Sequence, residues 1–414
     1  MRSFISTIGC AFAIVVLTAS AGAACAADSA EIRPFRIAVP DDVLVDLQSR
    51  LERTRWPDEI EGAGWGYGVE LAYMKELVDH WRTKYDWRAE ERKLNAIPQF
   101  VTTIDGVDLH FWHIRSKHAG ALPLVITHGW PGSVVEFLKI IGPLTDPTTH
   151  GGRAEDAFHV VCPSLPGFGF SGKPKVAGWS SARMAAAIRE LMARLGYEKY
   201  GAQGGDWGSG VSTWLANNDS QHVVGAHITF LGSGIPQIDD PWQGVTTAER
   251  ERYEARRKEL EQHFGYGAIQ GSRPQTIGYA LNDSPAGLAA WIVDKFWAWS
   301  DHGGDLDNSF TKDELLTNVM VYWVTETPAS AARIYFERGS VAGGAGKQVR
   351  VPIGVAMFPK EIGVPPRKWA EARYPLVHWT EMPRGGHFAA MEQPELLVGD
   401  IRKFFAQVRN ADGE

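Results

Sequence analysis

The chain has 414 residues, of which 44% are hydrophobic and 22% charged, and a net charge of −7. This length fits one large domain with insertions or about two or three smaller units, with enough apolar residues for a sizeable core. No basic cluster suited to a nucleic acid occurs, so nucleic acid is not expected as a partner. The 16 tryptophans are many for this length, and they suit both a core and the wall of an apolar pocket.

The N-terminus has the three parts of a secretory signal peptide, which we place at residues 1–27. Arg2 provides a short positive region, residues 8–17 are apolar, and residues 24–27 offer small side chains for cleavage. The apolar stretch is too short for a comfortable transmembrane helix. We therefore expect an exported protein, periplasmic or secreted, with no stable membrane span in its mature form. An uncleaved N-terminus that anchors the protein to a membrane is the second hypothesis.

Cysteine usage fits this expectation. Cys10 and Cys25 would leave with the signal peptide, so Cys162 would stand alone and no intramolecular disulfide is expected. Cys162 ends an apolar run, which indicates a buried small hydrophobic residue. No group of Cys and His has metal-ligand spacing, and we expect neither a metal nor another cofactor.

Residues 28–118 have a character of their own. Helices are predicted after Pro40 and near residues 69–84, the first from three leucines at helical spacing, Leu44, Leu47 and Leu51. Two strands, at 100–104 and 109–114, flank an Asp-Gly pair that is typical of a tight hairpin turn.

From residue 119 onward, strands and helices alternate. Continuous apolar runs at 122–127 and 158–162 predict strands that are covered on both faces. A helix with one apolar face is predicted at 181–195, and a further strand at 200–203. This alternation implies a parallel sheet with crossover helices.

The strand pattern stops between residues 232 and 345. Capping boxes that begin at Thr246 and Thr311 predict two helices, and Ser284-Pro285 predicts a third. This stretch is therefore interpreted as a helical cap inserted into the sheet domain.

Strand signals return at 352–358 and 376–380, and a helix at 394–408 ends the chain. The predicted α/β core thus consists of residues 119–231 and 346–414.

The most informative motif is Gly204-Gly-Asp-Trp-Gly208, which has the spacing of a nucleophile elbow. Such an elbow is a sharp strand-to-helix turn that raises one side chain above a sheet. Its central residue here is Asp206, a carboxylate that is already ionised at neutral pH. A carboxylate can attack a saturated carbon with a good or strained leaving group and form an alkyl ester. The elbow alone leaves epoxides, haloalkanes and other alkylating substrates open.

The remaining catalytic candidates occur in the chain order of the α/β-hydrolase fold, which is nucleophile, acid, histidine. His387, in the glycine-rich loop after the last strand, is the candidate base. Glu361 follows the preceding strand and is the candidate acid that orients His387. Asp400 and Glu381 are rivals for that role, but neither follows a strand before the histidine loop.

A candidate oxyanion loop follows the first core strand, with the sequence His128-Gly129-Trp130-Pro131-Gly132. The backbone N–H groups of Trp130 and Trp207 are the expected oxyanion donors, because this fold takes one donor from each of these two positions.

With these motifs the chain resembles a microsomal-type epoxide hydrolase of the α/β-hydrolase superfamily. Arg55-Trp-Pro57 and the stretch from Trp81 to Trp87 are similar to the meander domain of that family, and residues 278–290 to a segment of its cap. The resemblance implies a meander domain at 28–118 packed on an α/β-hydrolase core, with a mostly parallel sheet and a helical cap. It also implies Asp206 as nucleophile, Glu361 as charge relay and His387 as base.

This family also holds the epoxide oxygen with two cap tyrosines. By motif they correspond to Tyr266, in Phe264-Gly-Tyr-Gly267, and Tyr335, in Arg333-Ile-Tyr-Phe336. Tyr279 and Tyr322 are rival candidates for the same role. For any tyrosine in a helical cap, the default is packing of the ring with the hydroxyl at the surface. The resemblance implies that the enzyme converts a small hydrophobic epoxide and water into a vicinal diol through an ester on Asp206.

Two other functions stay open. A haloalkane dehalogenase also has Asp followed by Trp at its elbow, and Trp130 could then be a second halide donor. A catalytically silent protein that binds hydrophobic ligands in the same pocket is the other alternative. Whether the protein forms a homodimer is also open.

Overall fold

The computed structural model describes residues 30–232, 234–236, 239–337 and 349–411. The predicted signal peptide, with Arg2, Cys10 and Cys25, lies outside these residues. Within them, no helix combines the length and the apolar character that a membrane crossing needs.

The centre of the molecule is a nine-stranded sheet in the order β1-β2-β3-β5-β4-β6-β7-β8-β9. The last six strands in this order, which are β4 to β9 of the chain, run parallel, as predicted from the alternating pattern. They are β4 (Leu122–Thr127), β5 (Phe158–Pro163), β6 (Tyr200–Gly204), β7 (Val223–Ile228), β8 (Ile353–Met357) and β9 (Leu376–Glu381). The predicted α/β-hydrolase fold is confirmed.

The N-terminal strands join the same sheet through antiparallel pairs. These are β1 (Arg33–Pro34), β2 (Gln99–Ile104) and β3 (Val107–Ile114). The predicted hairpin between β2 and β3 is confirmed, and its Asp105 and Gly106 both have positive φ, 51° and 72°. Two such residues fit the twist of paired strands. β3 then pairs with β5, so the N-terminal region supplies one edge of the central sheet.

Helices cover both faces of the sheet. α4 (Leu138–Thr145) and α15 (Pro394–Ala411) pack against each other on one face. α5 (Ser181–Arg194) and α6 (Asp206–Asn218) pack together on the other. The inner strands β4 and β5 are therefore mostly buried, which explains their apolar runs, whereas β9 at the edge of the sheet is partly exposed. In the chain, the short helix α13 (Arg367–Arg373) precedes β9 and the short helix α14 (Ala389–Glu392) follows it.

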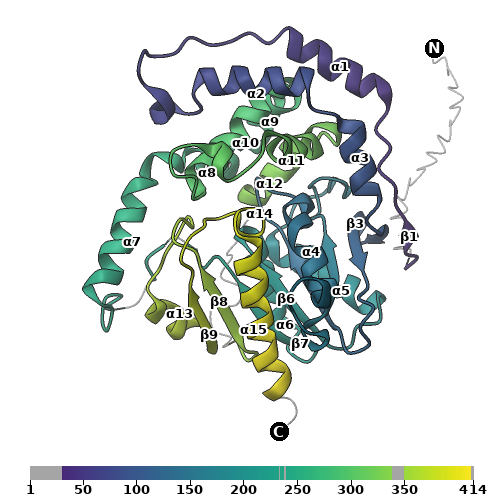
Figure 1. Cartoon of the computed structure of the whole chain (residues 1–414), viewed down its shortest axis with the longest axis vertical. Coiled ribbons are helices and arrows are strands. Elements are labelled where there is room, and N and C mark those ends of the chain that lie inside the picture. The colour runs from purple at the N-terminus through teal and green to yellow at the C-terminus, as the bar shows by residue number, and fades with distance from the viewer. Residues whose placement is uncertain (1–29, 233, 237–238, 338–348, 412–414) are drawn as a thin grey trace, which may run out of the picture.

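Six helices form the cap, which lies above the sheet except for its first helix, which runs down beside the sheet (Figure 1). They are α7 (Thr247–Glu259), α8 (Gly265–Ser272), α9 (Pro274–Asp283), α10 (Pro285–Trp299), α11 (Lys312–Val324) and α12 (Pro328–Phe336). The capping boxes predicted at Thr246 and Thr311 are present. The Ser284 side chain accepts a hydrogen bond at the start of α10. α8, α9 and α12 have no counterpart in the sequence prediction.

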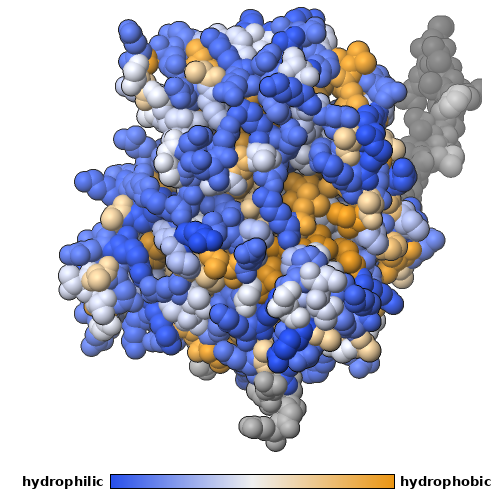
Figure 2. Space-filling view, in the orientation of Figure 1, coloured by the Kyte–Doolittle hydropathy of each residue, from blue (hydrophilic) through white to orange (hydrophobic). Residues whose placement is uncertain are grey.

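The N-terminal helices lie on the outer side of the cap (Figure 1). They are α1 (Asp41–Glu52), α2 (Leu71–Thr83) and α3 (Trp87–Asn95), and they contact α10 and α11. The cap is thus enclosed between these helices and the sheet. Figure 2 shows a mostly hydrophilic face, with hydrophobic residues gathered where the upper layers meet the core around α4.

Candidate active site

Asp206 lies at the turn between β6 and α6, where an elbow requires it. Its φ is +48°, a left-handed value that few residues other than glycine adopt. The turn also brings α6 very close to β4: a Cβ atom on Gly208 would lie 1.9 Å from the Thr127 carbonyl oxygen. Only glycine fits there, and the tight turn directs the Asp206 carboxylate away from the sheet.

The oxyanion loop lies directly against this carboxylate. The Trp130 N–H donates to Asp206 Oδ1 at 2.8 Å, and the Trp207 N–H also bonds to the Asp206 carboxylate. A Cβ atom on Gly129 would be 2.1 Å from the same oxygen, so the loop can approach only with glycine at this position. Both predicted backbone donors thus meet at Asp206.

His387 and Glu361 complete the group. Glu361 is fully buried, and its Oε1 lies 2.5 Å from His387 Nδ1 and accepts the Ile362 N–H at 2.6 Å. On the other side of the imidazole, Nε2 lies 3.6 Å from Asp206 Oδ2. The fold therefore brings the three residues together in the order carboxylate, imidazole, carboxylate.

The two rival carboxylates have other partners. Asp400 lies between His227 and His378, at 3.0 Å and 2.9 Å. Glu381 forms an ion pair with Arg252 at 3.0 Å. Neither carboxylate contacts His387 in the structure.

Opposing effects set the charge of the imidazole. Burial disfavours the charged form of His387, but the nearby Glu361 and Asp206 carboxylates outweigh it and raise the pKa of His387 to about 9. Burial likewise raises the pKa of Asp206, although the His387 charge and the two backbone N–H groups oppose this. The site is a tightly coupled group of buried charges.

Tyr266 on α8 and Tyr335 on α12 lie over the elbow. The Tyr266 ring stacks on Trp130 at 5.0 Å, and the Tyr335 ring meets the Trp207 ring edge-on, also at 5.0 Å. The two hydroxyls are within hydrogen-bond reach of each other. Burial raises the pKa of both phenols, so both keep their protons at neutral pH.

The competing tyrosines are placed differently. Tyr322 is buried, but its hydroxyl donates to the Gly132 carbonyl oxygen at 2.7 Å. Tyr279 is 72% exposed on α9. In the oxyanion motif, His128 uses Nε2 to accept the Leu165 N–H at 3.1 Å. Directly after the motif, the Ser133 hydroxyl donates to Asn318 Oδ1 at 2.8 Å. These contacts fix the loop that carries Trp130.

The sequence prediction does not include several residues near the site. Burial raises the pKa of Glu136 to about 8, and its Oε1 is 1.3 Å from where a Cβ atom on Gly132 would lie. Trp299 packs edge-on to the His387 ring at 5.2 Å. Glu136 follows the oxyanion motif closely and could have been suspected from that position, whereas nothing in the sequence distinguishes Trp299.

Over the described ranges, no three His, Cys, Asp or Glu side chains gather as metal ligands. Cys162 is buried, with its thiol pKa raised by burial, as expected for a core residue.

A mostly parallel sheet, a carboxylate at the elbow and a histidine–acid pair under a helical cap define a hydrolase of the α/β-hydrolase class. Residues 123–254 match the family model described as "alpha/beta hydrolase fold". Residues 32–137 match the model described as "Epoxide hydrolase N terminus".

Known proteins that are similar over nearly the whole chain indicate the same family. Epoxide hydrolase 1 of Sus scrofa is 40% identical over 410 residues, which cover 92% of this chain and 89% of that protein. The juvenile hormone epoxide hydrolase of Bombyx mori superposes with a TM-score of 0.84 at 31% identity, over 93% of this chain and 96% of that chain. The Aspergillus niger epoxide hydrolase gives 0.82 at 31% identity, over 92% and 97%. The chain belongs to the epoxide hydrolase family and is an enzyme of that kind, which confirms the resemblance drawn from its motifs.

Proposed function

We propose that the protein converts epoxides to vicinal diols through a covalent ester on Asp206. The observation that carries this proposal is the position of the Asp206 carboxylate. One of its oxygens accepts the Trp130 N–H at 2.8 Å, and the other lies 3.6 Å from His387 Nε2. The first oxygen is thus held in the oxyanion site, and the second is directed toward the base and the space under the cap.

In the first half-reaction, Asp206 Oδ2 attacks one epoxide carbon. The carbon–oxygen bond of the ring breaks, and its electron pair goes to the ring oxygen. Tyr266 and Tyr335 donate hydrogen bonds to that oxygen, and one of them supplies the proton. Two neutral phenols above the elbow suit this role, because they stabilise negative charge as it develops.

In the second half-reaction, neutral His387 takes a proton from water, and the hydroxide attacks the ester carbonyl carbon of Asp206. The Trp130 and Trp207 N–H groups hold the tetrahedral oxyanion. When this intermediate collapses, the bond between the carbonyl carbon and the diol oxygen breaks, and His387 returns the proton to the diol. Asp206 is left as a carboxylic acid, and its proton restores the tyrosine that lost one in the first half-reaction. Glu361 holds the imidazole in the required orientation.

Isotope labelling tests this route. In a single turnover in oxygen-18 water, the diol should carry unlabelled oxygen from Asp206, and the label should appear in the enzyme. A His387→Gln variant should accumulate the ester, detectable by mass spectrometry of the intact protein. Label appearing in the diol of the first turnover would exclude the covalent route.

The haloalkane reading makes a different prediction. In that case the indole N–H of Trp130, whose ring stacks on Tyr266 at an interplanar angle of 9°, would bind halide. Two tyrosine hydroxyls above the nucleophile suit an epoxide oxygen better than a halide. Halide release from chlorinated or brominated alkanes, with styrene oxide turnover measured in parallel, would decide between the two. A silent binding protein would turn over neither substrate, and Asp206→Ala would leave its ligand binding unchanged.

The substrate and the domain roles follow from the same site. We propose a small hydrophobic epoxide as substrate, because aromatic residues surround the elbow: Trp130, Trp207, Tyr266, Trp299 and Tyr335. Residues 28–118 would form the meander domain, 232–345 the cap, and 119–231 with 346–414 the core. A turnover screen with styrene oxide and long-chain epoxides, with Asp206→Ala as control, tests the substrate class.

Export is proposed on the N-terminal sequence alone. If the signal is cleaved, the mature protein should begin near residue 28, which intact-mass measurement of protein from the periplasm or medium would show. A full-length protein recovered with membranes would favour the anchored alternative.

A further inference from the structure

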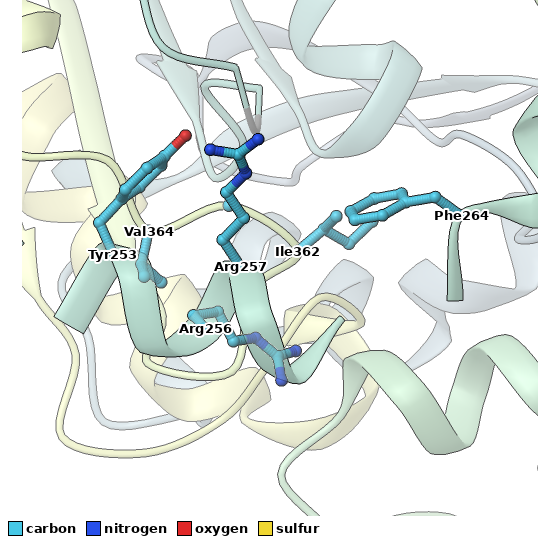
Figure 3. Close-up of a pocket in the computed structure, with 7 residues that line it drawn as sticks. Tyr253, Arg256, Arg257, Phe264, Ile362 and Val364 are labelled. Atoms are coloured by element: carbon cyan, nitrogen blue, oxygen red, sulfur yellow. The ribbon is translucent and has the colours of Figure 1, made fainter. Parts of the chain in front are cut away.

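Arg256 on α7 is a buried arginine outside the catalytic group described above. Its exposed fraction is 5%, whereas its neighbour Arg257 is exposed. Figure 3 shows the two side chains leaving α7 in different directions, beside a pocket that Tyr253, Phe264 and Ile362 also line. A buried guanidinium is stable only when its donors are satisfied, so its partners indicate its purpose.

Backbone carbonyl groups are the main partners of Arg256. Its Nε donates to the Glu361 carbonyl oxygen at 2.9 Å. Its Nη2 donates to the carbonyl oxygens of Lys360 at 2.6 Å and Ala298 at 3.2 Å. Its Nη1 forms an ion pair with the half-exposed Glu259 at 3.0 Å. One side chain of the cap thus holds the acid loop and the end of α10 together.

These contacts continue into the histidine loop. The Lys360 N–H donates to the Gly385 carbonyl oxygen at 3.1 Å. The His387 N–H donates to the carbonyl oxygen of Trp299, the residue after Ala298, at 2.8 Å. The contacts therefore close a ring that runs from Arg256 through the acid loop and the histidine loop to α10, and back to Arg256.

We propose that Arg256 is a positioning residue through which the cap sets the geometry of the Glu361–His387 pair. The guanidinium donates directly to the main chain of Glu361. It also donates to Ala298, and the next residue, Trp299, accepts the main-chain N–H of His387. The planar fork of arginine reaches all three carbonyl groups at once, which the single ammonium of lysine cannot do. This inference rests on the proposed function, in which His387 acts as base.

The two half-reactions separate this role from general stabilisation. The first needs Asp206 and the two cap tyrosines, whereas the second also needs His387 held by Glu361. A misplacement of about 1 Å can slow a reaction about 100-fold, so Arg256→Lys should slow ester hydrolysis about 10-fold to 100-fold and change alkylation by about twofold at most. The ester should therefore accumulate in the variant.

The experiment is a rapid-quench single turnover of styrene oxide, followed by mass spectrometry of the intact protein. Wild type, Arg256→Lys and Arg256→Gln are compared, with Arg257→Lys as the matched control from the same helix. Melting temperatures show which variants are folded. If Arg256→Lys does not fold, ester decay in Arg256→Gln provides the test instead. The pH dependence of ester decay should also move to lower pH in Arg256→Lys, because a misplaced Glu361 stabilises the imidazolium less.

The expected result is slow ester decay in the Arg256 variants and wild-type decay in Arg257→Lys. Folded Arg256 variants that hydrolyse the ester at the wild-type rate would overturn the inference. So would an equal loss in both half-reactions, because that outcome indicates a structural role alone. If no ester forms in wild type or in His387→Gln, the proposed covalent route itself fails and the inference fails with it.

Discussion

At the scale of single residues, the charge of His387 presents a problem that the reaction itself can solve. With its pKa raised to about 9, the imidazole is protonated in the resting enzyme at neutral pH and cannot act as a base. In the proposed route, alkylation would turn Asp206 into a neutral ester and remove one of the negative charges that raise this pKa. The first half-reaction of the proposed route would thus prepare the base that the second requires.

A titration of His387 by nuclear magnetic resonance tests this coupling. The wild-type pKa should lie near 9, and in Asp206→Asn it should be lower, because a neutral amide no longer stabilises the imidazolium. The signal is assigned by its loss in His387→Gln. An unchanged pKa in Asp206→Asn would mean that Asp206 does not contribute to the charge of the imidazole.

Substitution of the cap tyrosines makes a second prediction at this scale. Tyr266→Phe and Tyr335→Phe should each slow ester formation about 100-fold, because each removes a donor to the ring oxygen. The exposed Tyr279 provides the control, and Tyr279→Phe should leave the rate unchanged. Rapid-quench measurement of ester formation distinguishes the variants. A loss in Tyr322→Phe as large as that in Tyr335→Phe would speak against the assignment.

The sequence identifies residues that belong to motifs and misses those that act through tertiary contacts. Asp206, His387 and Glu361 could be predicted, and the fold brings them within 3.6 Å of one another in series. Arg256 could not, because its partners are carbonyl groups distant in the chain, and the pattern of α7 indicates only a charged helix.

At the scale of elements, the elbow depends on how closely α6 approaches β4. Gly208→Ala should destabilise the protein by about 3 kcal/mol, because its Cβ would lie 1.9 Å from a backbone oxygen that cannot easily move. Gly210 is in the same helix, and nothing lies within 4 Å of a Cβ atom placed there. Gly210→Ala should therefore stabilise the protein by about 0.5–1 kcal/mol. Denaturant unfolding measures both, and equal effects would contradict the packing argument.

Two elements that the sequence prediction misses, β7 and α8, have weak local patterns. In β7, the run Gly225-Ala226-His227 interrupts the β-branched residues, and pairing with β6 and β8 makes it a strand. α8 is short and rich in glycine. In such segments tertiary packing outweighs local propensity.

At the scale of the whole molecule, the N-terminal helices, the cap and the core share one continuous hydrophobic cluster. Leu47 of α1 and Trp81 of α2 belong to it, together with Leu288 of α10 and Leu316 of α11. The sequence predicted three regions, but it could not show how they pack, because apolar residues at helical spacing do not name their partners. A shared core implies that these layers unfold together.

This cooperativity can be tested with one buried tryptophan. Trp81 is 1% exposed and lies where α2 meets the cap helices. Trp81→Ala should cost about 3–5 kcal/mol, because it leaves a cavity in the cluster. If the layers are coupled, calorimetry should show one transition that moves as a whole to lower temperature. Trp56 is 37% exposed, so Trp56→Ala should leave the transition almost unchanged. Two separate transitions, of which Trp81→Ala moves only one, would show that the N-terminal helices and the cap unfold independently of the sheet.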